Sequence, residues 1–313
     1  MTITGFGKSS TGPVYSVPKS LWPESFGNHR AVLEISKPGE VLTLDILWRR
    51  HDPNPQKKQL IIVEASTGDT IANIFRYSVT SERCRLAFGP VKKAGTYYFY
   101  YLPYEVQENW GFYGKDYLKP EKSPSGKWVN MNKVGDVSKL SSFTSAKLNG
   151  FQSRTAFDSF YPMEIISLAS EKKSLLAKYT GDYMIFPEER SFPVRMKDEI
   201  PLRWVERGPS GKFSGEAMMN EYYAFQIGLY ASKKELLNVV VEFSGLENSS
   251  YRIPASSLTC FNTGGVGPYG KPFEKRVDVL MGAVQPLWIG IDIQDNIPAG
   301  NYKGKITIRP ENS

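Results

Sequence analysis

The amino-acid sequence predicts an all-β protein made of two antiparallel β-sandwiches, Ig-like or jelly-roll-like, joined by an extended, aromatic-rich connecting segment. Three observations support this prediction. Apolar and polar residues alternate along many short segments that are separated by Gly and Pro turns, a pattern typical of strands. No helix-period segment interrupts residues 30–104. At 313 residues the chain is too long for one core and suits two domains.

The first sandwich is expected over residues 29–160, after an N-terminal segment, 1–28, that is flexible or extended. Its clearest strand is EVLTLDILWR, residues 40–49, in which Leu42, Leu44, Ile46 and Trp48 make one face wholly apolar. Further strands are expected at residues 30–35, 60–65, 70–79, 84–90 and 94–104.

A long aromatic loop is expected at residues 105–150. Four of its rings are candidates for carbohydrate binding, because flat exposed rings stack on the apolar faces of sugars. These are Trp110, Tyr113, Tyr117 and Trp128. The alternative is that the same rings cover a sheet face or dock against a further domain.

A connecting segment is expected at residues 161–205. A strand at 163–169 followed by a turn is favoured over a helix at 162–179, because Pro162 directly precedes a β-branched run. Three prolines between 186 and 204 predict extended backbone there. Adjacent carboxylates such as Glu188 and Glu189 point to opposite sides of such a segment and cannot flank one glycosidic bond. Glu188, Arg190 and Arg195 are therefore assigned to a structural junction between the domains.

The second sandwich is expected over residues 206–313. Its strands are predicted at 221–232, 236–246, 251–273 (with a Gly-rich loop), 276–282 and, as a pair around a Pro-Gly turn, 287–310. In the last pair Leu287, Ile289, Ile291 and Ile293 share one face.

Composition argues against several classes of function. The net charge is +7, but the basic residues are scattered and match no nucleic-acid-binding motif. The two cysteines, Cys84 and Cys260, lie in apolar strand-like contexts; one long-range bridge is possible, and two buried free thiols are the favoured interpretation. The two histidines, His29 and His51, provide neither metal-ligand spacing nor a triad. We therefore expect no cofactor, no metal, no catalytic residue and no membrane insertion; the oligomeric state stays open.

Seven stretches together resemble the N-terminal β-sandwich region of multidomain glycoside hydrolases of family 123. They are WRRHD, AGTYYFYYLPY, FPEERSFPVRM, IPLRW, EYYAFQIGLYA, LTCFNTGG and QPLWIGIDIQDNIPAGNYKGKITI, which together reach from about residue 30 to near the end of the chain. The combination of FQIGLYA with LWIGIDIQDNIPAGNYKG is the most specific part of the resemblance.

The resemblance implies carbohydrate substrates, often with N-acetylhexosamine, and an Asp-Glu pair in a catalytic barrel that acts with the substrate's acetamido group. A (β/α)₈ barrel needs about 200 further residues, so no catalytic residue can be assigned here. We expect a domain end near AGNYKGKITIRPENS, in a truncated chain, a split gene product or a stand-alone relative. The resemblance also implies secretion or a periplasmic location, although no signal peptide is evident.

The expected function is that of a non-catalytic accessory region, which supports a catalytic barrel or binds glycan. Two other interpretations stay open. One is a stand-alone protein-interaction or scaffolding sandwich, and the other is an independent glycoside hydrolase.

Overall fold

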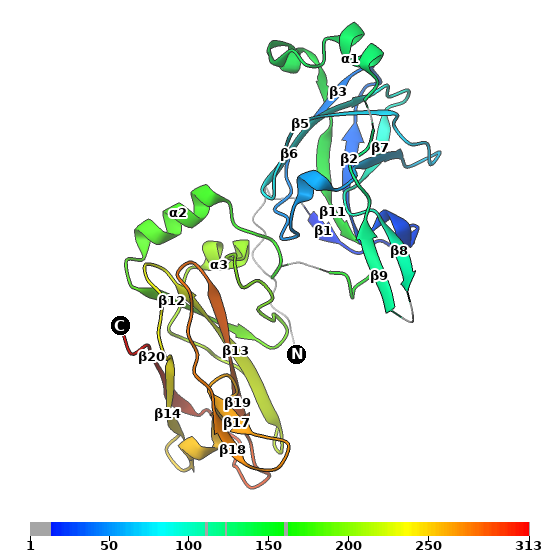
Figure 1. Cartoon of the computed structure of the whole chain (residues 1–313). Coiled ribbons are helices and arrows are strands. Elements are labelled where there is room, and N and C mark those ends of the chain that lie inside the picture. The colour runs from blue at the N-terminus through cyan, green and yellow to red at the C-terminus, as the bar shows by residue number, and fades with distance from the viewer. Residues whose placement is uncertain (1–13, 110–111, 123, 160–161, 313) are drawn as a thin grey trace. The chain divides into compact units, whose positions relative to one another are not determined.

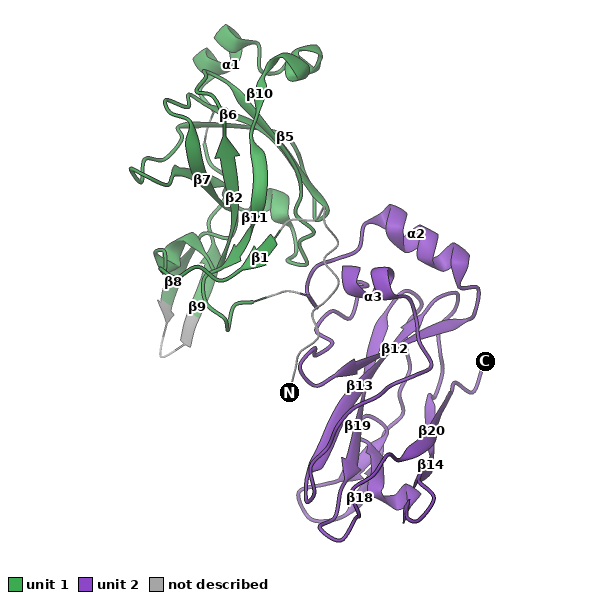
Figure 2. Cartoon of the chain, turned by 180° about the vertical axis from the view of Figure 1, so that it is seen from behind, with its two compact units in different colours: residues 1–161 green, residues 162–313 purple. Residues whose placement is uncertain are grey.

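The protein consists of two compact units, residues 1–161 and 162–313 (Figure 2). The structure, a computed structural model, describes residues 14–109, 112–122, 124–159 and 162–312, without the side chains of residues 108, 109, 112 and 113. Each unit is mostly β and has its own hydrophobic core, which confirms the predicted fold class.

Unit 1 is a sandwich of two sheets with strand orders β1-β11-β2-β7-β4 and β10-β3-β6-β5 (Figure 1). The first contains β1 (Val14–Ser16), β2 (His29–Ile35), β4 (Ile61–Glu64), β7 (Gly95–Tyr100) and β11 (Lys147–Ser153). The second contains β3 (Leu42–Leu47), β5 (Asn73–Val79), β6 (Arg83–Gly89) and β10 (Thr144–Ser145). Neighbouring strands are antiparallel except for β1 with β11 and β10 with β3.

The core of unit 1 follows from the period of two along its strands. Leu42, Leu44 and Ile46 of β3 are buried together with the inward residues of β2 and β7, such as Leu33 and Phe99. Their neighbours on β3 point away from the core, and Asp45 on that outer side pairs with Arg83. Alternation in the sequence therefore located both the strand and its buried face.

Part of the N-terminal segment 1–28 packs against the first sheet. Besides β1 it contributes a 3-10 turn, η1 (Glu24–Phe26), and the buried Trp22. Arg30 of β2 is almost fully buried there, with its guanidinium 4.2 Å from the Trp22 ring and 3.5 Å from the Tyr98 ring. Residues 1–13 lie outside the described part.

The prediction of a long loop at 105–150 is wrong, because this segment forms strands, a helix and a 3-10 turn. It contains the hairpin strands β8 (Tyr104–Asn109) and β9 (Phe112–Tyr117), helix α1 (Gly126–Asn132), the 3-10 turn η3 (Val137–Ser142), β10 and most of β11. β11 pairs with β2 along its whole length, so the end of the supposed loop is a central strand of the sandwich. A further 3-10 turn, η2 (Pro55–Lys57), precedes β4.

Unit 2 is a second sandwich, with strand orders β12-β13-β19-β16 and β15-β14-β20. The first sheet contains β12 (Tyr183–Glu189), β13 (Tyr222–Ala231), β16 (Leu258–Cys260) and β19 (Val284–Asp292). The second contains β14 (Val240–Glu247), β15 (Arg252–Ile253) and β20 (Lys303–Arg309). The 3-10 turn η4 (Ala255–Ser257) and a hairpin of β17 (Gly264–Val266) and β18 (Pro272–Glu274) complete the unit.

The core of unit 2 also follows from the alternation of inward and outward side chains along its strands. Phe225, Ile227 and Leu229 of β13 and Leu287 and Ile289 of β19 point inward. Val241, Phe243, Ile306 and Ile308 of the second sheet pack against this cluster. The intervening residues of β13 and β19 lie on the outer face of the first sheet.

Helices α2 (Ala169–Lys178) and α3 (Leu202–Arg207) cover one end of that outer face (Figure 1). Leu175 of α2 and Trp204 of α3 pack on Met184, Phe186 and Tyr230. The preference for a strand at 163–169 is therefore wrong, and the helical alternative is right for residues 169–178, since Pro162 lies well before the helix. Residues 162–207, which include the expected connecting segment 161–205 from its second residue on, supply α2, α3 and β12 to unit 2.

Cys84 and Cys260 are both free and buried. Among the described residues, none of the helices has the length and apolar character needed to cross a membrane.

Candidate functional site at the base of the hairpin

Tyr117 is the one candidate sugar-binding ring that is both described and exposed. It ends β9 and faces Tyr104, which begins β8, across the base of the hairpin. Tyr117 is 46% exposed, and the ammonium of Lys58 lies 4.1 Å from the centre of its ring. This cation–π contact stabilises the position of the ring.

Lys58 belongs to a buried cluster of charges. Arg50 donates two hydrogen bonds to Asp52, from Nε to Oδ1 at 2.7 Å and from Nη2 to Oδ2 at 2.5 Å, and Lys58 donates to Oδ2 at 2.5 Å. The Arg50 guanidinium also lies 4.4 Å from the ring of Trp48. Such a bidentate pair has a defined geometry, so the cluster fixes the place of Lys58 beneath Tyr117.

The pKa shifts in this cluster follow from burial and charge. Burial acts to raise the pKa of the Asp52 carboxyl, but the hydrogen bonds and positive charges of Arg50 and Lys58 outweigh it, and the pKa is lowered. Burial also lowers the pKa of the Lys58 ammonium, against the opposing effect of Asp52. Asp52 is therefore a firmly ionised partner for two cations at neutral pH.

A second contact ties the hairpin to the N-terminal segment. The hydroxyl of Tyr104 donates to Glu24 Oε1 at 2.5 Å, and Lys115 pairs with the same oxygen at 3.1 Å. Lys115 also lies 4.4 Å from the centre of the Tyr104 ring. Since Lys115 and Tyr117 are two residues apart on β9, they share one face of the hairpin.

The chain that leaves the hairpin is pinned to the sandwich by Glu121. Arg76 of β5 donates to both oxygens of Glu121, at 2.7 and 2.5 Å, and the backbone N–H of Leu60 donates to Oε2 at 3.0 Å. Arg76 also bonds to the carbonyl of Lys58. The base of the hairpin, with Tyr117 and Lys58, is thus held on both sides.

The excess positive charge lies in the unit that carries this hairpin. Unit 1 contains 21 Lys and Arg against 14 Asp and Glu, whereas unit 2 contains 18 of each. The scattered cations seen in the sequence are therefore unevenly divided, and polar or acidic ligands are favoured near unit 1.

The other predicted rings are not brought together with Tyr117. Trp110 lies outside the described residues, as does the side chain of Tyr113, whose backbone belongs to β9. Trp128 lies on α1, at the opposite end of the sandwich from the hairpin (Figure 1). It is only 7% exposed, packs on Val41 and Ala87, and donates from Nε1 to the Glu40 carbonyl at 3.1 Å. Its assignment as a surface ring for sugar is corrected to a core residue.

The three junction residues lie in ion pairs within unit 2. Arg190 pairs with Glu221 at 2.6 Å, and Arg195 pairs with Glu164 at 3.4 Å. Glu188 is 2% exposed and accepts hydrogen bonds from Trp204 Nε1 at 2.8 Å and Arg203 Nε at 3.2 Å. Glu188 thus anchors α3 to β12.

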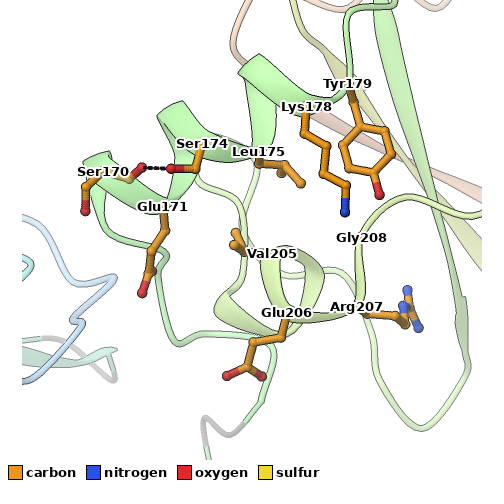
Figure 3. Close-up of a pocket in the computed structure, with 10 residues that line it drawn as sticks. All are labelled: Ser170, Glu171, Ser174, Leu175, Lys178, Tyr179, Val205, Glu206, Arg207 and Gly208. Atoms are coloured by element: carbon orange, nitrogen blue, oxygen red, sulfur yellow. Dashed lines mark hydrogen bonds between the residues drawn. The ribbon is translucent and has the colours of Figure 1, made fainter.

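A pocket of about 350 Å³ lies in unit 2 between α2 and α3 (Figure 3). Leu175, Tyr179 and Val205 form its apolar part. Several of its polar groups already serve the fold: Glu171 accepts from the backbone N–H of Leu168, and Arg207 pairs with Glu188. Lys178 of α2 and Glu206 of α3 also line the pocket and bring one charge of each sign to it.

Exposed rings of unit 2 were missed by the sequence analysis. Tyr222, Phe261 and Trp288 are each more than a third exposed. The signal was present for Trp288, because it alternates with the inward Leu287 and Ile289 and so must face outward.

Residues 20–154 match the family described as glycoside hydrolase 123, N-terminal domain. The matched residues lie in unit 1, so FQIGLYA and LWIGIDIQDNIPAGNYKG of unit 2 lie outside the match. No curated protein matches the chain.

Among solved structures, the chain is similar to a family 123 glycoside hydrolase from Clostridium perfringens that was analysed for the details of glycolipid glycan hydrolysis. The two share 19% sequence identity with a TM-score of 0.25, and the match covers 30% of this chain and 19% of that one. The likeness is too low to carry a structural argument.

Proposed function

We infer that this chain is a non-catalytic accessory region of a carbohydrate-active protein, because residues 20–154 match the glycoside hydrolase 123 N-terminal domain. Its role is to bind glycan with the hairpin surface of unit 1. The observation that carries the inference is the half-exposed Tyr117 ring, held over Lys58 inside the matched domain.

Physical chemistry supports a binding role for this surface. A ring that is already fixed loses little conformational entropy when a ligand stacks on it. Lys115 lies beside Tyr117 on the same face of the hairpin and offers N–H donors to sugar hydroxyl or carboxylate groups. Apolar ring faces next to polar donors are the combination that a pyranose requires, because its two faces are apolar and its edge carries hydroxyls.

Affinity electrophoresis of the whole chain through gels that contain soluble polysaccharides tests this function. Tyr117→Ala is expected to lose roughly tenfold in affinity, the scale of one stacked ring, whereas Tyr117→Phe is expected to keep most of it. Phe157→Ala provides the matched control, since Phe157 is an exposed ring of unit 1 that the site does not use.

Two results would contradict the function. If the polysaccharide gel retards Tyr117→Ala as much as the unchanged chain, and both unfold at the same denaturant concentration, the hairpin does not bind glycan. Release of reducing sugar during incubation would identify the chain as a hydrolase in its own right.

A further inference from the structure

Three aromatic side chains gather on the outer face of the first sheet of unit 2, at the end away from α2 and α3. Trp288 of β19 faces outward and is 36% exposed, and Phe261, directly after β16, is 49% exposed. The Phe261 N–H donates to the Trp288 carbonyl at 3.0 Å, so the two are cross-strand neighbours. Tyr222, which begins β13, is 48% exposed, and its ring centre lies 5.9 Å from that of Phe261. These three residues are called the aromatic platform.

Gly290 leaves room for the ring of Tyr222, which is tilted by 48° to the ring of Phe261. It lies on β19 between the outward-facing Trp288 and Asp292, and a side chain there would collide with the ring of Tyr222. The Tyr222 ring therefore lies across Gly290 and reaches from β13 toward Phe261. The Cε1, Cζ and Oη atoms of Tyr222 lie where a side chain at Gly290 would be, and nearly half of Tyr222 stays open to solvent.

Polar groups accompany the rings on this face. Asn262 accepts a hydrogen bond at Oδ1 from the Trp288 N–H at 2.7 Å, which fixes its side chain, and its NH₂ group is a hydrogen-bond donor. Thr259 lies opposite Gly290 in the register of β16 and β19, and Asp292 lies opposite Tyr222. Asp292 Oδ2 accepts a hydrogen bond from Gln294 Nε2 at 2.5 Å. A carboxylate can accept further bonds, so amide, hydroxyl and carboxylate groups lie near the rings.

The charge of unit 2 and the exposed area of the three rings indicate which ligand the platform fits. Unit 2 contains equal numbers of basic and acidic residues, and the nearby Arg190 and Glu221 neutralise each other. A neutral ligand thus fits the electrostatics. The exposed parts of the three rings amount to roughly 300 Å², well below the ~800 Å² per partner of a stable protein interface.

We propose that the aromatic platform of Tyr222, Phe261 and Trp288 is a second carbohydrate-binding site, which takes a neutral oligosaccharide of several pyranose units. The sugars stack on the rings, and their hydroxyls bond to Asn262, Thr259 and Asp292. The proposal rests on the carbohydrate function inferred above, but it uses residues of unit 2 alone.

Isothermal titration of the whole chain with neutral hexasaccharides of glucose, N-acetylglucosamine and galactose tests the site. Trp288→Ala and Tyr222→Ala are each expected to weaken binding roughly tenfold. Gly290→Ala retains all three rings but displaces Tyr222, so it is expected to weaken binding by a similar factor. Phe157→Ala is the control in unit 1. Tyr117→Ala is measured beside it to report on the hairpin site, and denaturant unfolding of every variant identifies any that fail to fold.

The outcomes separate this site from the hairpin. If the platform variants lose affinity for the hexasaccharide and Tyr117→Ala does not, the result supports the platform and contradicts the hairpin site. Unchanged binding in Trp288→Ala and Gly290→Ala overturns the platform, even if Tyr117→Ala shows that the proposed function holds. A chain that binds none of the three hexasaccharides, or a dimer that Trp288→Ala dissociates, overturns the platform as well.

Discussion

Asp52 is a residue on which the structure of unit 1 depends, because it pairs with two buried cations. Asp52→Asn keeps the shape of the side chain but leaves Arg50 and Lys58 without a counter-charge. Loss of one partner of a buried ion cluster costs about 3 kcal/mol. Denaturant unfolding is expected to show this loss. Asp45→Asn is the matched control: its pair with Arg83 is exposed, so we expect a change below about 1 kcal/mol.

The Asp52 carboxylate also makes the unfolding free energy of unit 1 depend on pH in acid. The folded-state pKa of Asp52 is lowered, so its contribution to stability is complete above its unfolded value of about 3.9 and is lost as the pH falls through the folded value. Asp52→Asn is expected to flatten the decline in unfolding free energy below about pH 4. An equally steep decline in the variant would show that other groups cause it.

Gly228 is needed where Trp204 of α3 crosses β13. A methyl group there would occupy the space of the Trp204 ring, which is fully buried and stacked on Phe186 at 4.4 Å. Gly228→Ala is therefore expected to lower the unfolding free energy by about 2 kcal/mol or more. Gly211→Ala is the control in the same unit, since nothing lies within 4 Å of its added methyl, and it is expected to change little.

At the scale of elements, the strands with one apolar face were predictable and the segments 105–150 and 162–179 were not. β3 was visible because Leu42, Leu44 and Ile46 alternate with polar residues. Trp128 gave no such signal, since its burial on α1 depends on Val41 and Ala87, which are far away in the sequence. A ring in a polar segment has the same local sequence whether it is a core residue or a binding residue.

Helix α2 was unpredictable for a related reason. Its only buried residue is Leu175, so it has no apolar stripe with a helical period. Packing of Leu175 on the outer face of the β12 sheet stabilises it. Tertiary contacts, rather than local preference, therefore determine this element.

Glu121 is expected to control the mobility of the segment behind the hairpin. Glu121→Ala removes the acceptor for Arg76 and for the Leu60 N–H, so residues 119–122 lose the attachment that Glu121 provides. Hydrogen exchange is expected to speed up in residues 119–122 and to stay unchanged in β13. Lys122→Ala, one residue away and exposed, serves as the control, and faster exchange there too would contradict the role given to Glu121.

At the scale of the whole molecule, the two separate cores predict separable unfolding. Asp52→Asn is expected to raise hydrogen exchange in the strands of unit 1, and Gly228→Ala in those of unit 2. Segment-resolved exchange followed by mass spectrometry measures both. Equal loss of protection in both units from either variant would show that the chain unfolds as one cooperative body.

The site could be predicted only in part at this scale. Tyr117 was identified from the sequence, but its partner Lys58 was not, because only the fold places residue 58 beneath residue 117. The platform likewise joins Tyr222 of β13, Trp288 of β19 and Phe261, which directly follows β16. Register between distant strands is set by the whole sandwich, and alternation along one strand cannot supply it.

The most direct test of the central claim is one titration of the intact chain with neutral oligosaccharides, followed by analysis of the recovered sugar. The account predicts saturable binding and recovery of the oligosaccharide at its original length. Shortened sugar would contradict the non-catalytic role, and the absence of any binding would contradict the carbohydrate function itself.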